Sequence, residues 1–367
     1  MLKIGIISPI SKEYPFLSRD LEEGLELALH RNGDIKLVPM EAGRGSPNDV
    51  TPVFRHLIIR EKVDIIVAFI DAISIKTVSD LIEQCRVPVI CTGMGARLPL
   101  TATQPDSCLL YNTYRMWESC WLAGNLASNT LGKKAGSISS FFDSGFPLVY
   151  AHSKGTETSG GYPVFFNITH KDLPEQEFAL IQQNMQTYDV DYYFISSFGK
   201  ERGEILDWLS RNGIPDERIV VSPSIHSLGQ EKALTVSSWF KDLEMPENVT
   251  FVNEYKATTK HQVNEFSMLG YETGLWIKQS LENDKTEFDS TSFLQQMKTA
   301  VFSGPRGLVR VNNNQMAYTS HYLPSPDNET GKMQYQQLDY PLWEVEQEIA
   351  ANSITNVIGW QNTYLCK

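Results

Sequence analysis

The chain has 367 residues, 41% of them hydrophobic and 21% charged, with a formal net charge of −12. At about 100–200 residues per domain this length predicts two or three domains, and the composition excludes a disordered or collagen-like chain. The negative charge repels phosphate, and no cluster of Lys and Arg overrides it locally, so nucleic-acid binding is excluded. The sequence holds no apolar run near the ~20 residues that span a bilayer, so no membrane insertion is expected.

Short apolar runs alternate with amphipathic stretches in the first part of the chain. The apolar runs predict strands, and the amphipathic stretches predict helices. In chain order, the expected elements are a strand at 3–8, a helix at 17–32, a strand at 35–40, a helix at 48–61, a strand at 63–70, a helix at 73–85 and a strand at 87–92. Strands that are apolar throughout and alternate with helices indicate a parallel sheet with helices on both faces.

The same plan recurs in the second half of the chain at a nearly constant offset. Three strand starts match in register: 3–7 with 134–138, 63–66 with 190–193, and 87–90 with 219–222. An offset this long is a domain-sized duplication rather than a solenoid repeat. The sequence therefore predicts two similar α/β domains.

The alternation changes after residue 232. Here the pattern predicts a strand at 233–239, a long helix at 264–281, a shorter helix at 293–301 and a strand at 308–311. The end of the chain is rich in Tyr, Asn and Gln, and we expect β-hairpins and loops there.

The sequence contains none of the catalytic and cofactor motifs that we sought. It lacks the GxGxxG turn of dinucleotide-binding folds, the GxxxxGK[ST] phosphate loop and the GxSxG nucleophile elbow. Its seven histidines show no paired metal-ligand spacing, and its five cysteines form no CxxC. We therefore expect a protein that is not an enzyme and that uses no cofactor and no metal.

Several segments, taken in order, resemble the leucine/isoleucine/valine-binding-protein branch of the type I periplasmic binding proteins. The segments that carry the resemblance are 3–9, 21–29, 63–68, 87–90, 269–272 (LGYE) and 302–309 (FSGPRGLV). The resemblance implies an α/β fold of two similar doubly wound parallel-sheet lobes joined by a three-crossing hinge, a Venus-flytrap architecture. It places lobe one at 1–113 and 240–312, and lobe two at 114–239 and 313–367.

The resemblance also implies a function. It indicates a protein that binds a small polar metabolite, amino-acid-like, amide or short peptide-like, in the cleft between the lobes with hinge closure. Its partners would be that small-molecule ligand and an ABC permease, and its location would be the periplasm once a leader had been removed. Because Met1 leads directly into an apolar strand, the alternative is a cytoplasmic ligand-sensing regulatory or receptor module of the same fold, with a regulatory partner.

The candidate ligand-binding residues follow from the strand ends, because ligands bind outside the carboxyl ends of parallel strands. They are Tyr14, Phe16, Phe69, Asp71, Ala72, Met94, Asp143, Phe198, Ser224 and His226. In the family that the chain resembles, hydroxyl and backbone N–H groups at positions matching 71–74 and 92–94 hold the ligand carboxylate. Asp71 and Asp143 stand at predicted strand ends, one in each lobe, and no Lys or Arg occupies the matching positions. These two residues favour a ligand with a cationic or hydrogen-bond-donating group. The alternative for Asp71 is to cap the helix expected near residue 73.

Overall fold

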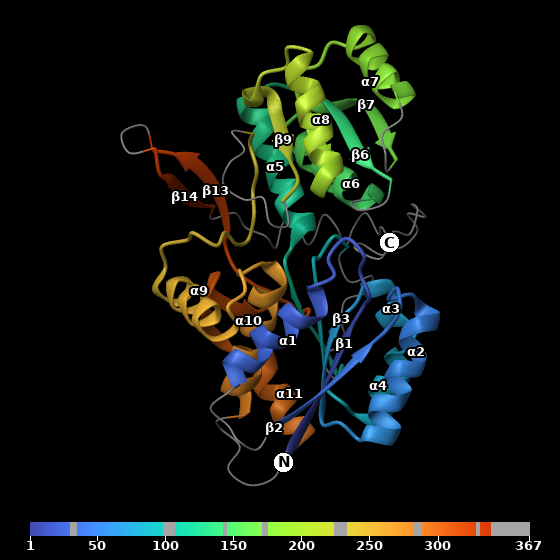
Figure 1. Cartoon of the computed structure of the whole chain (residues 1–367), viewed down its shortest axis with the longest axis vertical. Coiled ribbons are helices and arrows are strands. Elements are labelled where there is room, and N and C mark those ends of the chain that lie inside the picture. Colours follow the sequence, from blue (N-terminus) through green and yellow to red (C-terminus); the bar gives the residue numbers. More distant parts are fainter. Residues whose placement is uncertain are drawn as a thin grey trace. The chain divides into compact units, whose positions relative to one another are not determined.

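A computed structural model describes residues 1–29, 35–97, 107–141, 145–170, 175–223, 233–281, 288–327 and 331–338. The chain forms two compact units, which we call unit 1 and unit 2 (Figure 1). Unit 1 comprises Met1–Tyr114 and Trp239–Ser320, and unit 2 comprises Arg115–Ser238 together with the described residues from His321 onward. The chain therefore passes from one unit to the other after Tyr114, after Ser238 and after Ser320.

Unit 1 is built on a five-stranded parallel sheet in the order β2-β1-β3-β4-β5. Its strands are β1 (Leu2–Ser8), β2 (Ile35–Glu41), β3 (Ile65–Phe69), β4 (Val89–Gly93) and β5 (Leu109–Thr113). Every residue of β3 and β4 is buried, as expected for strands that are covered on both faces. Because all five strands run the same way, their carboxyl ends lie along one edge of the sheet.

Helices cover both faces of this sheet (Figure 1). One face carries α1 (Leu17–Leu29) and α10 (Glu265–Leu281); the other carries α2 (Pro47–Arg55), the π-helix at His56–Glu61, α3 (Ala72–Lys76) and α4 (Ser79–Cys85). Unit 1 also contains α9 (Pro246–Thr259), α11 (Ser290–Thr299) and a small antiparallel sheet of β10 (Val301–Gly304), β11 (Gly307–Val311) and β12 (Ala317–Tyr318).

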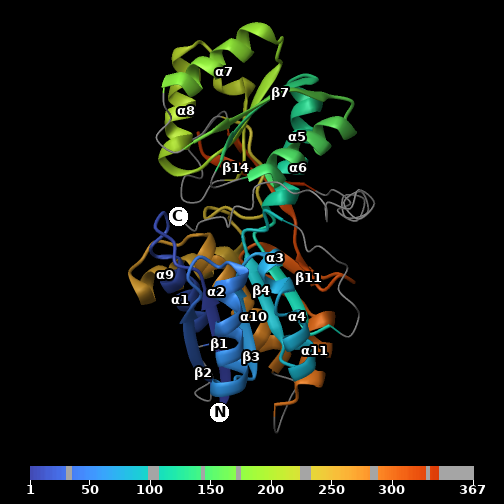
Figure 2. The same cartoon turned by 90° about the vertical axis from the view of Figure 1, so that its right-hand side faces the viewer.

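Unit 2 repeats this architecture with a four-stranded parallel sheet in the order β7-β6-β8-β9. The strands are β6 (Lys134–Ser140), β7 (Tyr162–Thr169), β8 (Tyr192–Ser196) and β9 (Ile219–Val221). The helices α5 (Met116–Thr130) and α6 (Gly145–Thr158) lie on one face, and α7 (Glu175–Thr187) and α8 (Gly199–Arg211) on the other (Figure 2). A short 3-10 helix at Asp216–Arg218 precedes β9, and an antiparallel hairpin of β13 (His321–Pro326) and β14 (Met333–Leu338) completes the described part of the unit.

The two sheets confirm the predicted duplication. Strands β1, β2, β3 and β4 occupy the same places in their sheet as β6, β7, β8 and β9 do in theirs. Each unit also contains a tightly crossed helix pair, α1 with α10 and α5 with α6. A Cβ atom added to Gly24, Gly270, Gly124 or Gly155 would lie 1.9 to 2.1 Å from a backbone carbonyl oxygen of the facing helix. Both pairs therefore depend on glycine at the crossing.

Several predicted elements differ from the structure. The helix predicted at 48–61 is α2 followed by a π-helical turn, and the helix predicted at 73–85 is divided into α3 and α4. The strand predicted at 233–239 is wrong: this segment makes only isolated bridges, through Leu234 to β9 and through Ser237 to β13. The backbone changes its pairing partner from β9 to β13 within three residues, so it does not form a continuous strand with either.

Helix α9 and strand β5 are among the elements that were not predicted. Helix α9 has a weak apolar pattern, because its buried face consists of Asn248, Phe251 and Tyr255. Strand β5 is short and follows the predicted strand of β4 after a long connection.

The predicted lobe boundary at 312 lies before the last passage between the units, because β12 still pairs with β11 in unit 1.

His152 is a buried histidine of α6 whose titration is expected to affect stability. Its ring stacks on Phe194 with centroids 3.9 Å apart, and burial lowers its pKa to about 3. Neither ring nitrogen has a hydrogen-bond partner among the described residues. An unfolded histidine titrates near pH 6.5, so below that pH the unfolded state binds the proton and the folded state does not.

We therefore expect stability to fall as the pH drops from about 6.5 towards 3, by about 2 kcal/mol at pH 5 from this residue. The variant His152→Phe should lose this part of the pH dependence, as measured by urea unfolding at pH 7.5 and pH 5. The exposed His56 serves as the control, because His56→Gln should retain the dependence. A His152→Phe variant as sensitive to acid as the parent protein would contradict the assignment.

Candidate functional site

Aromatic side chains gather at the carboxyl edge of the unit 1 sheet. The predicted residues Tyr14, Phe16 and Phe69 surround Phe266 at the start of α10, with ring centroids 5.7, 6.0 and 5.6 Å from it. Phe266, Tyr14 and Phe69 are buried, and Phe16 is half-buried. The structure thus brings the three predicted aromatics together around a residue that the sequence analysis missed, because α10 returns to this edge from a distant part of the chain.

An ion pair links the loops that follow β3 and β4. The Nε atom of Arg97 lies 3.9 Å from Oδ2 of Asp71, and the two side chains are 14% and 23% exposed. Asp71 therefore has a cationic neighbour, although no Lys or Arg occupies the matching strand-end positions. The loop after β4 turns at Gly95, which has a φ of 67°, and Arg97 approaches Asp71 beyond this turn.

Asp71 also stands directly before α3. Its carbonyl oxygen accepts the backbone N–H groups of Ser74 and Ile75 at 3.0 and 3.2 Å. The hydroxyl of Ser74 donates to the carbonyl oxygen of Gly45 at 2.7 Å, so this side chain ties α3 to the loop after β2. The side chain of the predicted residue Ala72 lies outside the described part of the structure.

Thr92 places a buried hydroxyl at the end of β4. Its side chain is 1% exposed, and among the described residues its Oγ1 atom has no hydrogen-bond partner. Leaving such a group unsatisfied costs about 1–3 kcal/mol, which a ligand atom placed against it would recover. Met94, a predicted site residue, follows two positions later and is also buried. The end of β4 therefore offers an unused donor at the edge where ligands of this sheet type bind.

A buried arginine organises the corresponding edge of unit 2. The guanidinium of Arg202, in the first turn of α8, donates through Nε to the carbonyl oxygen of Ser197 at 2.6 Å. Its Nη2 atom donates to the carbonyl and hydroxyl oxygens of Ser222, both at 2.8 Å. The guanidinium also lies over the ring of the predicted residue Phe198, 5.1 Å from its centroid. The sequence did not lead to Arg202, although Arg202 follows Phe198 by four residues, about one helical turn.

Ser197 is a second buried hydroxyl at a strand end. It follows β8, it is 0% exposed, and its Oγ atom has no hydrogen-bond partner among the described residues. The edge of unit 2 therefore resembles that of unit 1 in offering a buried hydroxyl at a strand end and an arginine a few residues later in the sequence. Three predicted site residues, Asp143, Ser224 and His226, lie outside the described residues.

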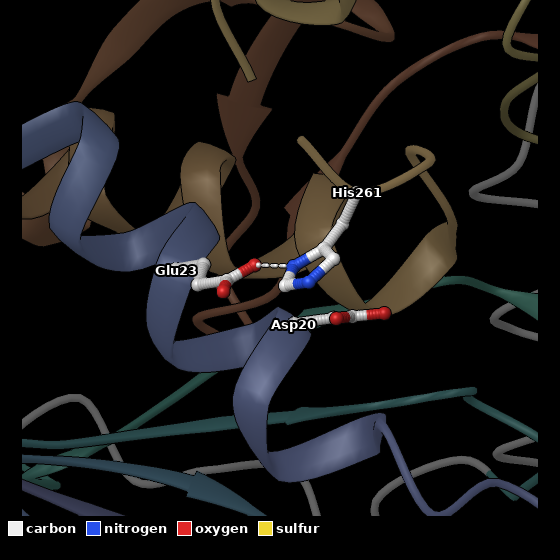
Figure 3. A group of neighbouring side chains, drawn as sticks. All are labelled: Asp20, Glu23 and His261. Atoms are coloured by element: carbon white, nitrogen blue, oxygen red, sulfur yellow. Dashed lines mark hydrogen bonds and ion pairs between the residues drawn. The ribbon is translucent and has the colours of Figure 1, made fainter. Parts of the chain in front are cut away.

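One other group of side chains has the composition of a metal site. Asp20 and Glu23 of α1 and His261, which follows α9, bring one ligand atom each within 4.8 Å of one another (Figure 3). Protein groups already engage them: Glu23 Oε2 lies 2.9 Å from His261 Nδ1 and accepts the hydroxyl of Tyr255 at 2.8 Å. The guanidinium of Arg19 lies 2.7 Å from Asp20. This positive charge opposes a bound cation, so we assign the group to joining α1 with the end of α9.

Among the described residues, no helix is both long and apolar enough to cross a membrane. A family model described as a periplasmic binding protein matches residues 1–323. The chain belongs to the periplasmic binding protein family. This membership confirms the resemblance, and the two parallel-sheet units confirm the predicted fold class. It also agrees with the prediction of a binding protein that is not an enzyme.

Solved structures of the same fold include transport proteins with different ligands. An ABC transporter substrate-binding protein from Sphaerobacter thermophilus is 20% identical, with a TM-score of 0.78 over 92% of this chain and 97% of that one. A solute-binding protein of an ABC transporter from R. palustris, in complex with benzoate, is 20% identical, with a TM-score of 0.73 over 92% and 96%. LivJ from Streptococcus pneumoniae, in complex with isoleucine, is 17% identical, with a TM-score of 0.68 over 92% and 100%. No curated protein gave a significant match.

Proposed function

We propose that this protein is the substrate-binding component of an ABC importer and that it binds a small organic carboxylate. Family membership supports the binding role. Benzoate, 4-hydroxybenzoate and isoleucine, the ligands bound in three of the similar structures, all carry a carboxylate group. The proposal includes a location in the cell envelope and an ABC permease as the partner that receives the ligand.

The observation that carries the ligand class is the unused hydroxyl of Thr92. A carboxylate oxygen is an acceptor, and a buried hydroxyl donates to it without a competing protein acceptor. Arg97 adds a positive charge beyond the same strand. A guanidinium can form two short bonds with a ligand carboxylate.

The rest of the ligand is proposed to be apolar or aromatic. Phe16 at the unit 1 edge and Phe198 at the unit 2 edge supply aromatic surface, and Ser197 supplies a hydroxyl for a distal polar group. As the family resemblance implies, we propose that ligand binding favours a closed state of the protein through the ligand's greater affinity for that state.

The variant Thr92→Val tests this assignment, because valine keeps the shape of threonine and lacks the hydroxyl. Hydrogen bonds to charged groups contribute about 1.5–3 kcal/mol, so affinity for the carboxylate should fall by roughly 10- to 150-fold. The stability of the free protein should be unchanged or higher, because a buried unsatisfied group is removed. Calorimetric titration with benzoate, 4-hydroxybenzoate, leucine and isoleucine measures the first effect, and thermal unfolding measures the second.

Thr156→Val is the matched control. The hydroxyl of Thr156 is buried and already bonded to the carbonyl oxygen of His152 at 2.9 Å and to Tyr192 at 2.8 Å. Thr156→Val should lower the stability of the protein and leave its affinity for the carboxylate unchanged, which is the opposite of the result expected for Thr92→Val. If Thr92→Val bound its acid as tightly as the parent protein, Thr92 would not contact the carboxylate.

A further inference from the structure

Arg306 and Glu272 form a fully buried ion pair in unit 1. Arg306 lies in the turn between β10 and β11, and Glu272 lies on α10. The Nε atom of Arg306 donates to both carboxylate oxygens of Glu272, at 3.2 and 3.1 Å, and its Nη2 atom also donates to Oε1. Both side chains are 0% exposed. A Cβ on Gly304 would lie 3.0 Å from Oε2 of Glu272, so the turn approaches the carboxylate closely.

The same guanidinium holds the chain just before its first passage between the units. Nη1 of Arg306 donates to the carbonyl oxygen of Thr113 at 2.7 Å, and Nη2 donates to Oδ1 of Asn112 at 2.7 Å. The amide of Asn112 in turn donates to Thr273 on α10 at 3.1 Å. The end of β5 is therefore fixed to α10 immediately before the chain leaves unit 1 after Tyr114.

The other two passages connect to the same network. The carbonyl oxygen of Arg306 accepts the hydroxyl of Thr319 at 2.8 Å, one residue before the chain leaves unit 1 after Ser320. The hydroxyl of Tyr114 donates to the carbonyl oxygen of Trp239 at 3.2 Å, and Trp239 is the first residue of unit 1 after the second passage. Arg306 thus contacts the first and third passages directly, and Tyr114 joins the first to the second.

The backbone at the first passage is itself constrained. Arg115, the first residue of unit 2, has a left-handed conformation with φ of 61° and ψ of 40°. Residues other than glycine keep such a conformation when the surrounding structure determines it. Hinges are a few loop or element-terminal residues that absorb changes in backbone angles between rigid bodies, and Arg115 stands at such a place, directly before α5.

We infer that Arg306 is a positioning residue for the hinge: with Glu272, it sets the direction in which the connecting segments leave unit 1. This role goes beyond the proposed ligand and does not depend on its identity. A pair that only stabilised the fold would have no effect on the distribution of distances between the units, whereas a positioning pair controls it.

The test removes the pair without leaving a buried charge. The double variant Arg306→Met with Glu272→Leu replaces both side chains by apolar groups. Proteins often tolerate such a replacement of a buried ion pair. Spin labels are placed at Arg60→Cys in unit 1 and Arg211→Cys in unit 2, both exposed positions. The background carries Cys85→Ser, because Cys85 is exposed, and Cys366→Ser. Pulsed electron paramagnetic resonance then measures the distances between the two labels in the ligand-free protein.

The double variant should fold and show a broader, shifted distance distribution. Tyr192→Phe, which removes a buried hydrogen bond in unit 2, is the control and should leave the distribution unchanged. An unchanged distribution in the folded double variant, or equal broadening in the control, would overturn the inference. If the double variant does not fold, Arg306→Lys provides the test, and its distance distribution should also be broader and shifted. Lysine keeps the positive charge, but it lacks the planar guanidinium that contacts Asn112, Thr113 and Glu272 together.

Discussion

Gly270→Ala is expected to destabilise the protein by about 3 kcal/mol or more, at the upper end of what overpacking costs. A Cβ at this position would lie 2.1 Å from the carbonyl oxygen of Leu21 and 3.0 Å from the backbone nitrogen of Leu25. Both atoms belong to the backbone of α1, so the contact cannot be relieved by rotating a side chain. The two helices must separate, which loosens the buried face that both present to the sheet.

Gly203→Ala is the matched control for this prediction. Gly203 is an exposed residue in the interior of α8, and a Cβ there would meet nothing within 4 Å. Alanine is the better helix former by about 0.8–1.0 kcal/mol, so this variant should be slightly more stable than the parent. Urea unfolding of both variants measures the difference. Equal effects of the two substitutions would mean that α1 and α10 do not cross as closely as the structure places them.

The second large effect is expected from Glu272→Leu. This substitution leaves the guanidinium of Arg306 buried without its carboxylate, which costs about 3–5 kcal/mol. Combining it with Arg306→Met should restore most of the lost stability, since no buried charge then remains. The unfolding free energies of the single and double variants provide the measurement. A double variant less stable than Glu272→Leu alone would show that the pair is not the source of the loss.

The fold was predictable wherever aliphatic residues carry a regular pattern. The strand starts at 3–7 and 63–66 and their counterparts at 134–138 and 190–193 all fall at parallel strands in equivalent places. The pattern failed where polar residues do the packing. In α9 the buried Asn248 donates to the carbonyl oxygens of Lys241 and Leu243, both at 2.9 Å, and no periodicity of apolar residues reports this role.

Two of the segments that carry the family resemblance contain residues with a clear structural role. In 269–272, Gly270 allows α10 to approach α1, and Glu272 is one half of the buried pair. In 302–309, Gly304 leaves room for that carboxylate, and Arg306 supplies the other half. The sequence shows these residues as two distant motifs, and only the fold shows that they contact each other.

The candidate site was predictable in position more than in composition. The rule that ligands bind at the carboxyl ends of parallel strands led to Tyr14, Phe69 and Asp71. It could not find Phe266, which reaches the edge from a helix far along the chain, or Arg97, which approaches Asp71 beyond the turn at Gly95. Arg97 reverses the expected electrostatics at Asp71, because it turns an isolated carboxylate into one half of an ion pair.

The central claim, binding of a small organic carboxylate, is tested most directly by thermal unfolding of the intact protein with matched acids and amides. The acids are benzoate, 4-hydroxybenzoate, leucine and isoleucine, and the controls are benzamide and leucinamide, which lack the carboxylate. A ligand at 100 times its dissociation constant adds about 2.7 kcal/mol of stability. We expect at least one acid to raise the unfolding temperature saturably while its amide does not. If no acid raised it, or if an amide raised it as much as its acid, the claim would be contradicted.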